Sequence, residues 1–193
     1  MNNDKEIGAL MKRTTSLIAL FLSCISLRAD DLRVSTMEPL VAVTTNKWQS
    51  APDRQPGGAF PFETYRIVPP GSRNAACLVS ILDKNRKEFG NPDVLKKILR
   101  GDCLPYVNSP DELSKIDLKE MKINGGLGFI VNFVDPDLVG KPVIKGSYKT
   151  GTPVIFSLGS NYLFKVTILC DEIDGADYRD AIAIVQSIKV KKE

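Results

Sequence analysis

Hydrophobic and polar residues alternate with a period of two through much of the second half of the chain, a pattern typical of half-buried β-strands. The segments 116–135 and 153–171 each contain two such runs. Turn-forming residues separate the runs, with Asn-Gly at 124–125 and Gly-Ser-Asn at 159–161. Asn-Gly is a strong signal for a two-residue turn because both residues accept positive φ. We therefore expect two β-hairpins.

Four further stretches predict strands, because they are rich in β-branched and aromatic residues or alternate in polarity: 40–45, 62–68, 75–82 and 187–192. The run 75–82 is continuously apolar, which is typical of a buried strand. The stretch 50–59 is rich in proline and glycine and predicts a loop. Residues 30–39 have the composition of a polar lead-in.

Helical spacing is clearest in two segments, 91–101 and 175–186. The first has Asn91 as a candidate N-cap, proline in the first turn and Gly101 at its end. The second repeats apolar residues at helical intervals, and these should face the core: Tyr178, Ala181, Ile182 and Val185. Residues 109–113 predict a shorter helical turn.

The N-terminal region has the features of a secretory signal. Lys12 and Arg13 precede an uncharged, mostly apolar stretch of twelve residues, 16–27, which is shorter than the roughly 20 residues that a membrane-spanning helix needs. Cleavage after Ala29 would start the mature chain at Asp30. The ten residues before Met11 are unusual ahead of a signal, so Met11 is a candidate true start. The alternative is a buried N-terminal helix.

Cys24 allows a second interpretation of this region. Bacterial lipoprotein signals end in a small residue followed by the cysteine that is lipidated, and Ser23 precedes Cys24. Phe21 departs from that pattern, because leucine is usual at its position. The two readings are a lipid-anchored protein and a cysteine that merely lies within the apolar stretch.

The other three cysteines, Cys77, Cys103 and Cys170, would remain after cleavage. An oxidising compartment permits one disulfide among them and leaves one thiol over. Cys77 and Cys170 lie in apolar strand-like runs, which favours buried free thiols. The sequence leaves the disulfide state open.

Composition narrows the classes of function. With 43% hydrophobic and 25% charged residues in 193, the chain has the balance of a soluble globular domain. A net charge of +3 and a short basic stretch at 189–192 do not favour nucleic-acid binding, because no stacking aromatic residues accompany them. There is no histidine, which makes a zinc site improbable.

The acidic stretch 171–180, DEIDGADYRD, is the most conspicuous candidate for chemistry. If Gly175 took position 6 of a helix-loop-helix calcium loop, Cys170 and Ala181 would occupy ligand positions 1 and 12, so the template fails at both ends. We therefore expect Asp174 to cap the following helix, Asp177 and Asp180 to point outward into solvent, and no tightly bound ion.

Other candidates for catalysis are weaker still. Asp102 precedes Cys103, but no histidine can act as the base for a thiol nucleophile. The acids at 135–137 flank a proline and predict a strand-ending turn. The glycines at 125–128 lack the Gly-Lys-Ser/Thr of a phosphate loop. We assign no catalytic, cofactor-binding or metal-ligating residue and expect no cofactor.

The order of elements resembles the PsbP-like fold, and most closely secreted bacterial proteins of unknown function with that fold. In that family a near-terminal strand leads into a helix that ends in a Ser-Ile/Leu-Lys strand, which Ser187-Ile188-Lys189 matches. The likeness spans roughly residues 40–192. The segments that carry it are Trp48 with Pro52, FETYRI (62–67), AACLVSIL (75–82), NPDVLKKILRG (91–101), INGGLGFIV (123–131), NYLFKVTILCD (161–171) and YRDAIAIVQSIKV (178–190).

The resemblance implies an α/β/α sandwich, in which an antiparallel sheet is flanked by helices, in one domain over 40–193. It carries no active-site motif. We expect an exported, non-catalytic binding or assembly module, periplasmic or secreted, with an unknown protein or small-molecule partner in the cell envelope. Membrane contact is expected only through the signal or a lipid on Cys24. The alternatives are a hydrolase that works through carboxylates and a lipid-anchored accessory protein. An apolar patch, for example around 60–62, would favour the binding module.

Overall fold

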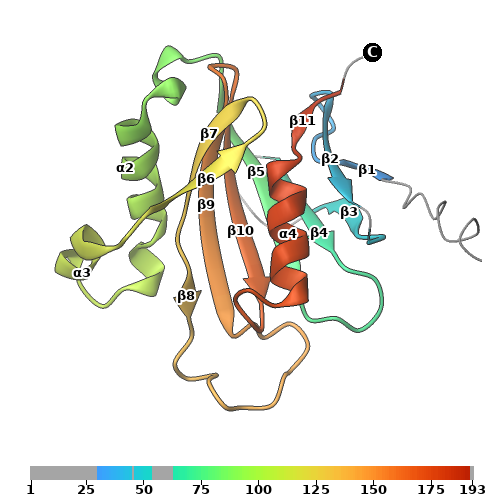
Figure 1. Ribbon diagram of the computed structural model, residues 1–193, viewed down its shortest axis with the longest axis vertical. Coiled ribbons are helices and arrows are strands. Elements are labelled where there is room, and N and C mark those ends of the chain that lie inside the picture. Colours follow the sequence, from blue (N-terminus) through green and yellow to red (C-terminus); the bar gives the residue numbers. More distant parts are fainter. Residues whose placement is uncertain (1–29, 45, 54–62, 192–193) are drawn as a thin grey trace, which may run out of the picture.

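The computed structural model describes residues 30–44, 46–53 and 63–191. The predicted secretory signal, Cys24 and the apolar residues 60–62 lie outside the described residues. The described chain forms an α+β fold in which two antiparallel sheets are accompanied by helices (Figure 1). The fold class expected from the sequence is therefore confirmed.

The larger sheet has the strand order β3-β4-β5-β10-β9-β7-β6, and β8 pairs with β9 beyond the end of β7. Each pairing is antiparallel. The strands are β3 (Gln49–Pro52), β4 (Thr64–Val68), β5 (Ala76–Lys84), β6 (Lys119–Ile123), β7 (Gly126–Ile130), β8 (Phe133–Val134), β9 (Thr150–Leu158) and β10 (Tyr162–Cys170).

The smaller sheet has the order β1-β2-β11. Its strands are β1 (Asp30–Arg33), β2 (Leu40–Thr44) and β11 (Lys189–Val190). The helices are α2 (Pro92–Asp102), α3 (Pro110–Lys115) and α4 (Ala176–Gln186), with short 3-10 turns η1 (Lys87–Gly90) and η2 (Leu104–Tyr106). Figure 1 shows α2 and α4 on opposite sides of the larger sheet.

The core divides into two apolar clusters because side chains alternate along β9. Val154 and Phe156 face the cluster that contains α4 and the smaller sheet, whereas Ile155 faces the cluster that contains α2. Every residue of β9 is buried. Phe156 stacks on Phe164 of β10 with ring centroids 4.6 Å apart, which makes the β9–β10 pair the centre of the molecule.

The two hairpins expected from alternation are present as β6–β7 and β9–β10. In the first turn only Gly125 has positive φ, at 76°, so Asn124 does not adopt the left-handed conformation that the Asn-Gly signal suggested. Asn91 caps α2 as expected and accepts a hydrogen bond from the Asp93 N–H at 2.9 Å.

Strands β1 and β3 fall in segments that the sequence analysis assigned to a polar lead-in and a loop. Leu32 and Val34 are buried against the main core. Their two-residue spacing is the local pattern that indicates strand β1. β3 is exposed along most of its length, so no apolar alternation marks it. Its pairing with β4 determines it instead.

Truncation of a buried residue in α4 tests which face of this helix packs against the core. Val185 and Ala181 are buried as expected and Ile182 is partly buried, but Ile184, which the expected face omitted, is only 1% exposed. Ile184→Ala should lower the free energy of unfolding by about 2–5 kcal/mol, because it removes buried methyl groups and leaves a cavity.

Urea denaturation would measure that loss, with Val139→Ala as the control. Val139 is 61% exposed, so its truncation should change the unfolding free energy by less than about 0.5 kcal/mol. Equal losses for the two variants would contradict the assignment of the buried face.

Candidate functional site

A cleft forms where strand β6 separates from the β7–β8 line. Lys119 pairs with Ile130, and this is the last pair between β6 and β7. Before Lys119 the chain runs away toward α3 rather than along β8 (Figure 1). The cleft has a volume of about 320 Å³, and its lining residues are Ile116, Asp117, Lys119, Ile130, Val131, Asn132 and Phe133.

Pro153 explains why the strand is interrupted between β7 and β8. The register of β9 with β7 continues unchanged into β8, since Ile130 pairs with Val154 and Phe133 with Gly151. Val131 donates its N–H to the Pro153 carbonyl at 3.2 Å. Proline has no N–H to return the bond, so the ladder is broken opposite Val131.

The strand edge beside β8 is open. Val131 and Asp135 both donate backbone N–H groups toward β9, to Pro153 and Lys149. Because these directions alternate along an antiparallel strand, the N–H and C=O groups of Asn132 and Val134 point the opposite way. Within the part of the chain that the structure describes, no strand lies on that side. Asn132 is exposed, and Val134 is 51% exposed.

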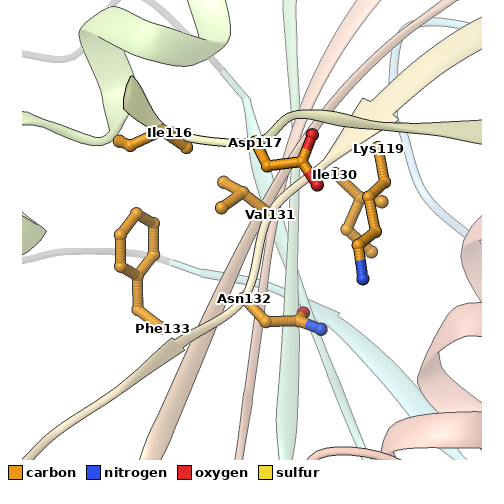
Figure 2. Close-up of a pocket in the computed structure, with 7 residues that line it drawn as sticks. All are labelled: Ile116, Asp117, Lys119, Ile130, Val131, Asn132 and Phe133. Atoms are coloured by element: carbon orange, nitrogen blue, oxygen red, sulfur yellow. The ribbon is translucent and has the colours of Figure 1, made fainter. Parts of the chain in front are cut away.

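The two faces of this edge differ in character. Figure 2 shows Ile116, Val131 and Phe133 around one hollow, while Lys119 and Asn132 extend on its other side. On the apolar face, the Tyr106 ring stacks on Phe133 with centroids 4.7 Å apart and 11° between the ring planes.

A glycine at position 151 leaves room for Tyr106 in this position. A Cβ added to Gly151 would lie 3.0 Å from Cε1 of Tyr106. Tyr106 and Phe133 also line a second hollow of about 450 Å³, together with Val134 and Tyr148. The two residues of the open edge therefore line two hollows that share Phe133, Asn132 the first and Val134 the second.

Asn132 is held in place from the other face. Its Oδ1 accepts hydrogen bonds from Thr152 Oγ1 at 2.8 Å and from the Tyr178 hydroxyl at 3.1 Å. Burial raises the pKa of Tyr178, which keeps its hydroxyl protonated and able to donate. These two bonds fix the side chain of Asn132 while its backbone groups remain on the open edge.

The acidic stretch serves a different purpose from the one expected. The N-cap of α4 is Gly175, with no side-chain cap, and Asp174 adopts a left-handed backbone at φ 64°. The expectation that Asp174 caps the helix is therefore wrong. A Cβ on Gly175 would approach the Glu172 carbonyl oxygen to 3.1 Å, which favours glycine at the cap.

Asp177 and Asp180 are also not simply solvated, which corrects the outward-pointing assignment. Arg73 pairs with Asp177 at 2.8 Å and with Asp180 at 3.5 Å. Asp180 also accepts hydrogen bonds from Asn46 Nδ2 at 2.7 Å and from the buried Trp48 Nε1 at 3.4 Å. These contacts join the first half of α4 to the segments before β3 and β5. Neither residue was predictable in this role, because its partners are distant in the sequence.

Three carboxylates share one hollow of the described chain, but neither glutamate there has the raised pKa of a general acid. A hollow of about 440 Å³ contains Glu38, Glu63 and Asp83. Hydrogen bonds from Lys84 and Tyr162 hold the pKa of Glu38 below its ordinary value. Partial burial acts to raise the pKa of Glu63, but hydrogen bonds from Thr36 and Ser35 outweigh it and the pKa is lowered.

The three described cysteines, Cys77, Cys103 and Cys170, are buried and free. Burial raises the pKa of Cys77 to about 12 and that of Cys103 to about 11, where the carboxylate of Asp102 adds to the shift. Asp102 itself pairs with Lys165 at 2.6 Å. Both thiols are therefore protonated at neutral pH and are poor nucleophiles.

Among residues 30–44, 46–53 and 63–191, no group of three or more cysteine, aspartate or glutamate side chains is arranged to hold a metal ion. The helices in these ranges are all too short or too polar to cross a membrane. No family model matches the chain, and no curated protein is significantly similar to it.

Asp180 should contribute more to stability than Asp177, although both pair with Arg73. Asp180→Ala leaves the buried Trp48 N–H without its acceptor and should cost about 1–3 kcal/mol. Asp177→Ala removes only a partly exposed ion pair, for which about 1 kcal/mol or less is expected. Denaturation of both variants tests this order, and a larger loss for Asp177→Ala would contradict it.

Protonation of Glu63 should lower the free energy of unfolding at acidic pH. Because its pKa is lower in the folded state than its ordinary value of 4.5, the stability that it contributes is present above pH 4.5 and is lost as the pH falls through the folded value. Glu63→Gln should be less stable than the wild type at neutral pH and should approach it in acid. Urea midpoints across this range measure the effect. Parallel curves for the two proteins would exclude it.

Proposed function

We propose that the protein is an exported, non-catalytic binding module of the periplasm or the extracellular space. We further propose that its ligand is an extended polypeptide segment lying beside β8. The observation that carries this proposal is the open edge at Asn132 and Val134, where β6 has already left the sheet. A peptide in extended conformation presents the matching row of N–H and C=O groups.

The geometry also supports a pattern of side chains that such a peptide should carry. Residues paired across neighbouring strands point to the same face of a sheet. Side chains opposite Val131 and Phe133 would enter the hollow formed with Ile116, so apolar residues suit them. A side chain opposite Asn132 would lie on the face that holds Lys119, so a polar residue suits it. The expected ligand alternates apolar and polar residues.

A hydrolase that uses two carboxylates receives less support. That chemistry needs two acids facing each other across a cleft, one of them with a raised pKa when it acts as the general acid. The cleft beside β8 is lined by a single acid, Asp117, and the larger hollow that contains Tyr106 by Asp135. The pKa values of Glu38 and Glu63, in the hollow that contains both, are shifted in the opposite direction.

Export and family membership are also parts of the proposal. The support for export is the sequence pattern at 12–29, and cleavage after Ala29 would leave every described strand in the mature chain. The support for membership of the PsbP-like family is the antiparallel sheet between α2 and α4, with α4 leading into the terminal strand β11.

Val134→Pro tests the binding proposal directly. It removes the outward-facing N–H, and proline is tolerated on an edge strand whose N–H faces solvent. Val134→Thr is the matched control, since it keeps the N–H and the β-branched shape. A phage library of random heptapeptides would be selected on the wild-type protein, and binding to all three proteins would then be measured.

Selected peptides should alternate apolar and polar residues and bind the wild type and Val134→Thr equally. Loss of the one backbone hydrogen bond that the Val134 N–H would donate should weaken binding to Val134→Pro by about two- to twelve-fold, since one net bond contributes about 0.5–1.5 kcal/mol. Failure to select any peptide, or equal binding to Val134→Pro, would contradict the proposal.

A further inference from the structure

The β8–β9 loop, residues 135–149, leaves an unusual number of apolar side chains in solvent. Val139 is 61% exposed, Val143 56% and Ile144 65%. These are three of the eight large hydrophobic residues that are exposed in the described chain. Such clustering of apolar surface marks interaction sites in soluble proteins.

The charged residues in the distal part of the same loop are all positive. Lys141, Lys145 and Lys149 lie between residues 138 and 149, and this range contains no aspartate or glutamate. The two acids of the loop, Asp135 and Asp137, lie at its start beside β8. Lys141 and Lys145 are exposed next to Val143 and Ile144, so apolar and cationic groups are interleaved on one tip.

The loop is ordered by hydrogen bonds rather than by burial of its apolar residues. Asn74 donates to the carbonyl oxygen of Ser147 at 2.9 Å and accepts from the Gly146 N–H at 2.9 Å. Its side-chain nitrogen also lies 3.0 Å and 3.1 Å from the carboxylate oxygens of Asp171. Asn74 therefore fastens the tip to the body of the protein while Val143 and Ile144 remain in water.

The loop projects past the end of the larger sheet, on the side of the molecule opposite β11 (Figure 1). A projecting loop in which exposed aliphatic residues and lysines alternate along the chain suits a flat anionic surface. There the aliphatic groups enter the boundary between headgroups and acyl chains, and the lysines contact the lipid phosphates. We infer that the β8–β9 loop docks the folded domain onto the surface of an anionic lipid bilayer.

This docking is independent of the peptide-binding edge and of any signal or lipid at the N-terminus. The folded domain itself would then contact a membrane, in addition to any contact that the N-terminal segment makes. The apolar residues supply attraction that salt does not screen, whereas the lysine contribution weakens as ionic strength rises. Binding should therefore require both anionic headgroups and the aliphatic tip.

A fluorescent reporter at the tip tests the inference without interference from the N-terminal segment. The chain has a single tryptophan, and it is the buried Trp48, so Ile144→Trp adds an exposed reporter on the loop. Val190→Trp is the control, because Val190 is 44% exposed and lies at the other end of the molecule (Figure 1). Each protein would be titrated with phosphatidylglycerol vesicles and with phosphatidylcholine vesicles.

Phosphatidylglycerol vesicles should shift the Ile144→Trp emission to shorter wavelength, phosphatidylcholine vesicles should not, and Val190→Trp should respond to neither. Lys141→Gln and Lys145→Gln, each added to Ile144→Trp, should weaken binding by about five-fold per lysine. Absence of the shift, an equal shift in the control, or indifference to both lysines would overturn the inference. A concentration-dependent dimer that Ile144→Ser abolishes would overturn it as well, because the tip would then contact a second copy.

Discussion

The structure depends on the pairing of β9 with β10. This hairpin holds nine residue pairs in register, and β9 is buried on both faces. The side chains of this hairpin alternate between the two apolar clusters, so its register determines which residues enter each cluster. A slip of one residue would turn every side chain to the opposite face of the sheet. The α4 cluster and the α2 cluster are therefore set by the same register, and Phe156 stacked on Phe164 lies at its middle.

Pro153 lies within this buried strand, and its missing N–H breaks the ladder toward the β7–β8 line. The open edge on the far side of that line has a separate cause, the departure of β6. β6 ends its pairing one residue earlier, at Lys119 and Ile130. The free backbone groups of Asn132 and Val134 then lie beside the stacked rings of Tyr106 and Phe133, for which Gly151 leaves room. The open edge of the candidate site thus follows from the departure of β6, and its aromatic surface from packing against β9.

Local patterns were sufficient to predict the hairpins, α2 and α4, because alternation and helix-end residues act within a few positions of the chain. They were insufficient for β3, which is held by its partner β4 rather than by its own composition. The same limit applies to Asp180, whose contacts with Trp48 and Asn46 span more than 130 positions. At the candidate site, the stacking of Tyr106 on Phe133 joins η2 to β8, and no spacing in the sequence could reveal that contact.

The β8–β9 loop shows where folding alone fails to explain the sequence. Side chains that stay in solvent gain no stability from being valine or isoleucine, and polar residues would serve equally well at these positions of a turn. Here Asn74 and Asp171 hold the loop in one conformation through hydrogen bonds, while Val143 and Ile144 stay exposed. An ordered backbone beneath exposed aliphatic side chains lowers the entropy that must be lost on contact with a surface. The fold therefore accounts for the shape of the loop, and the proposed docking on a bilayer would account for its composition.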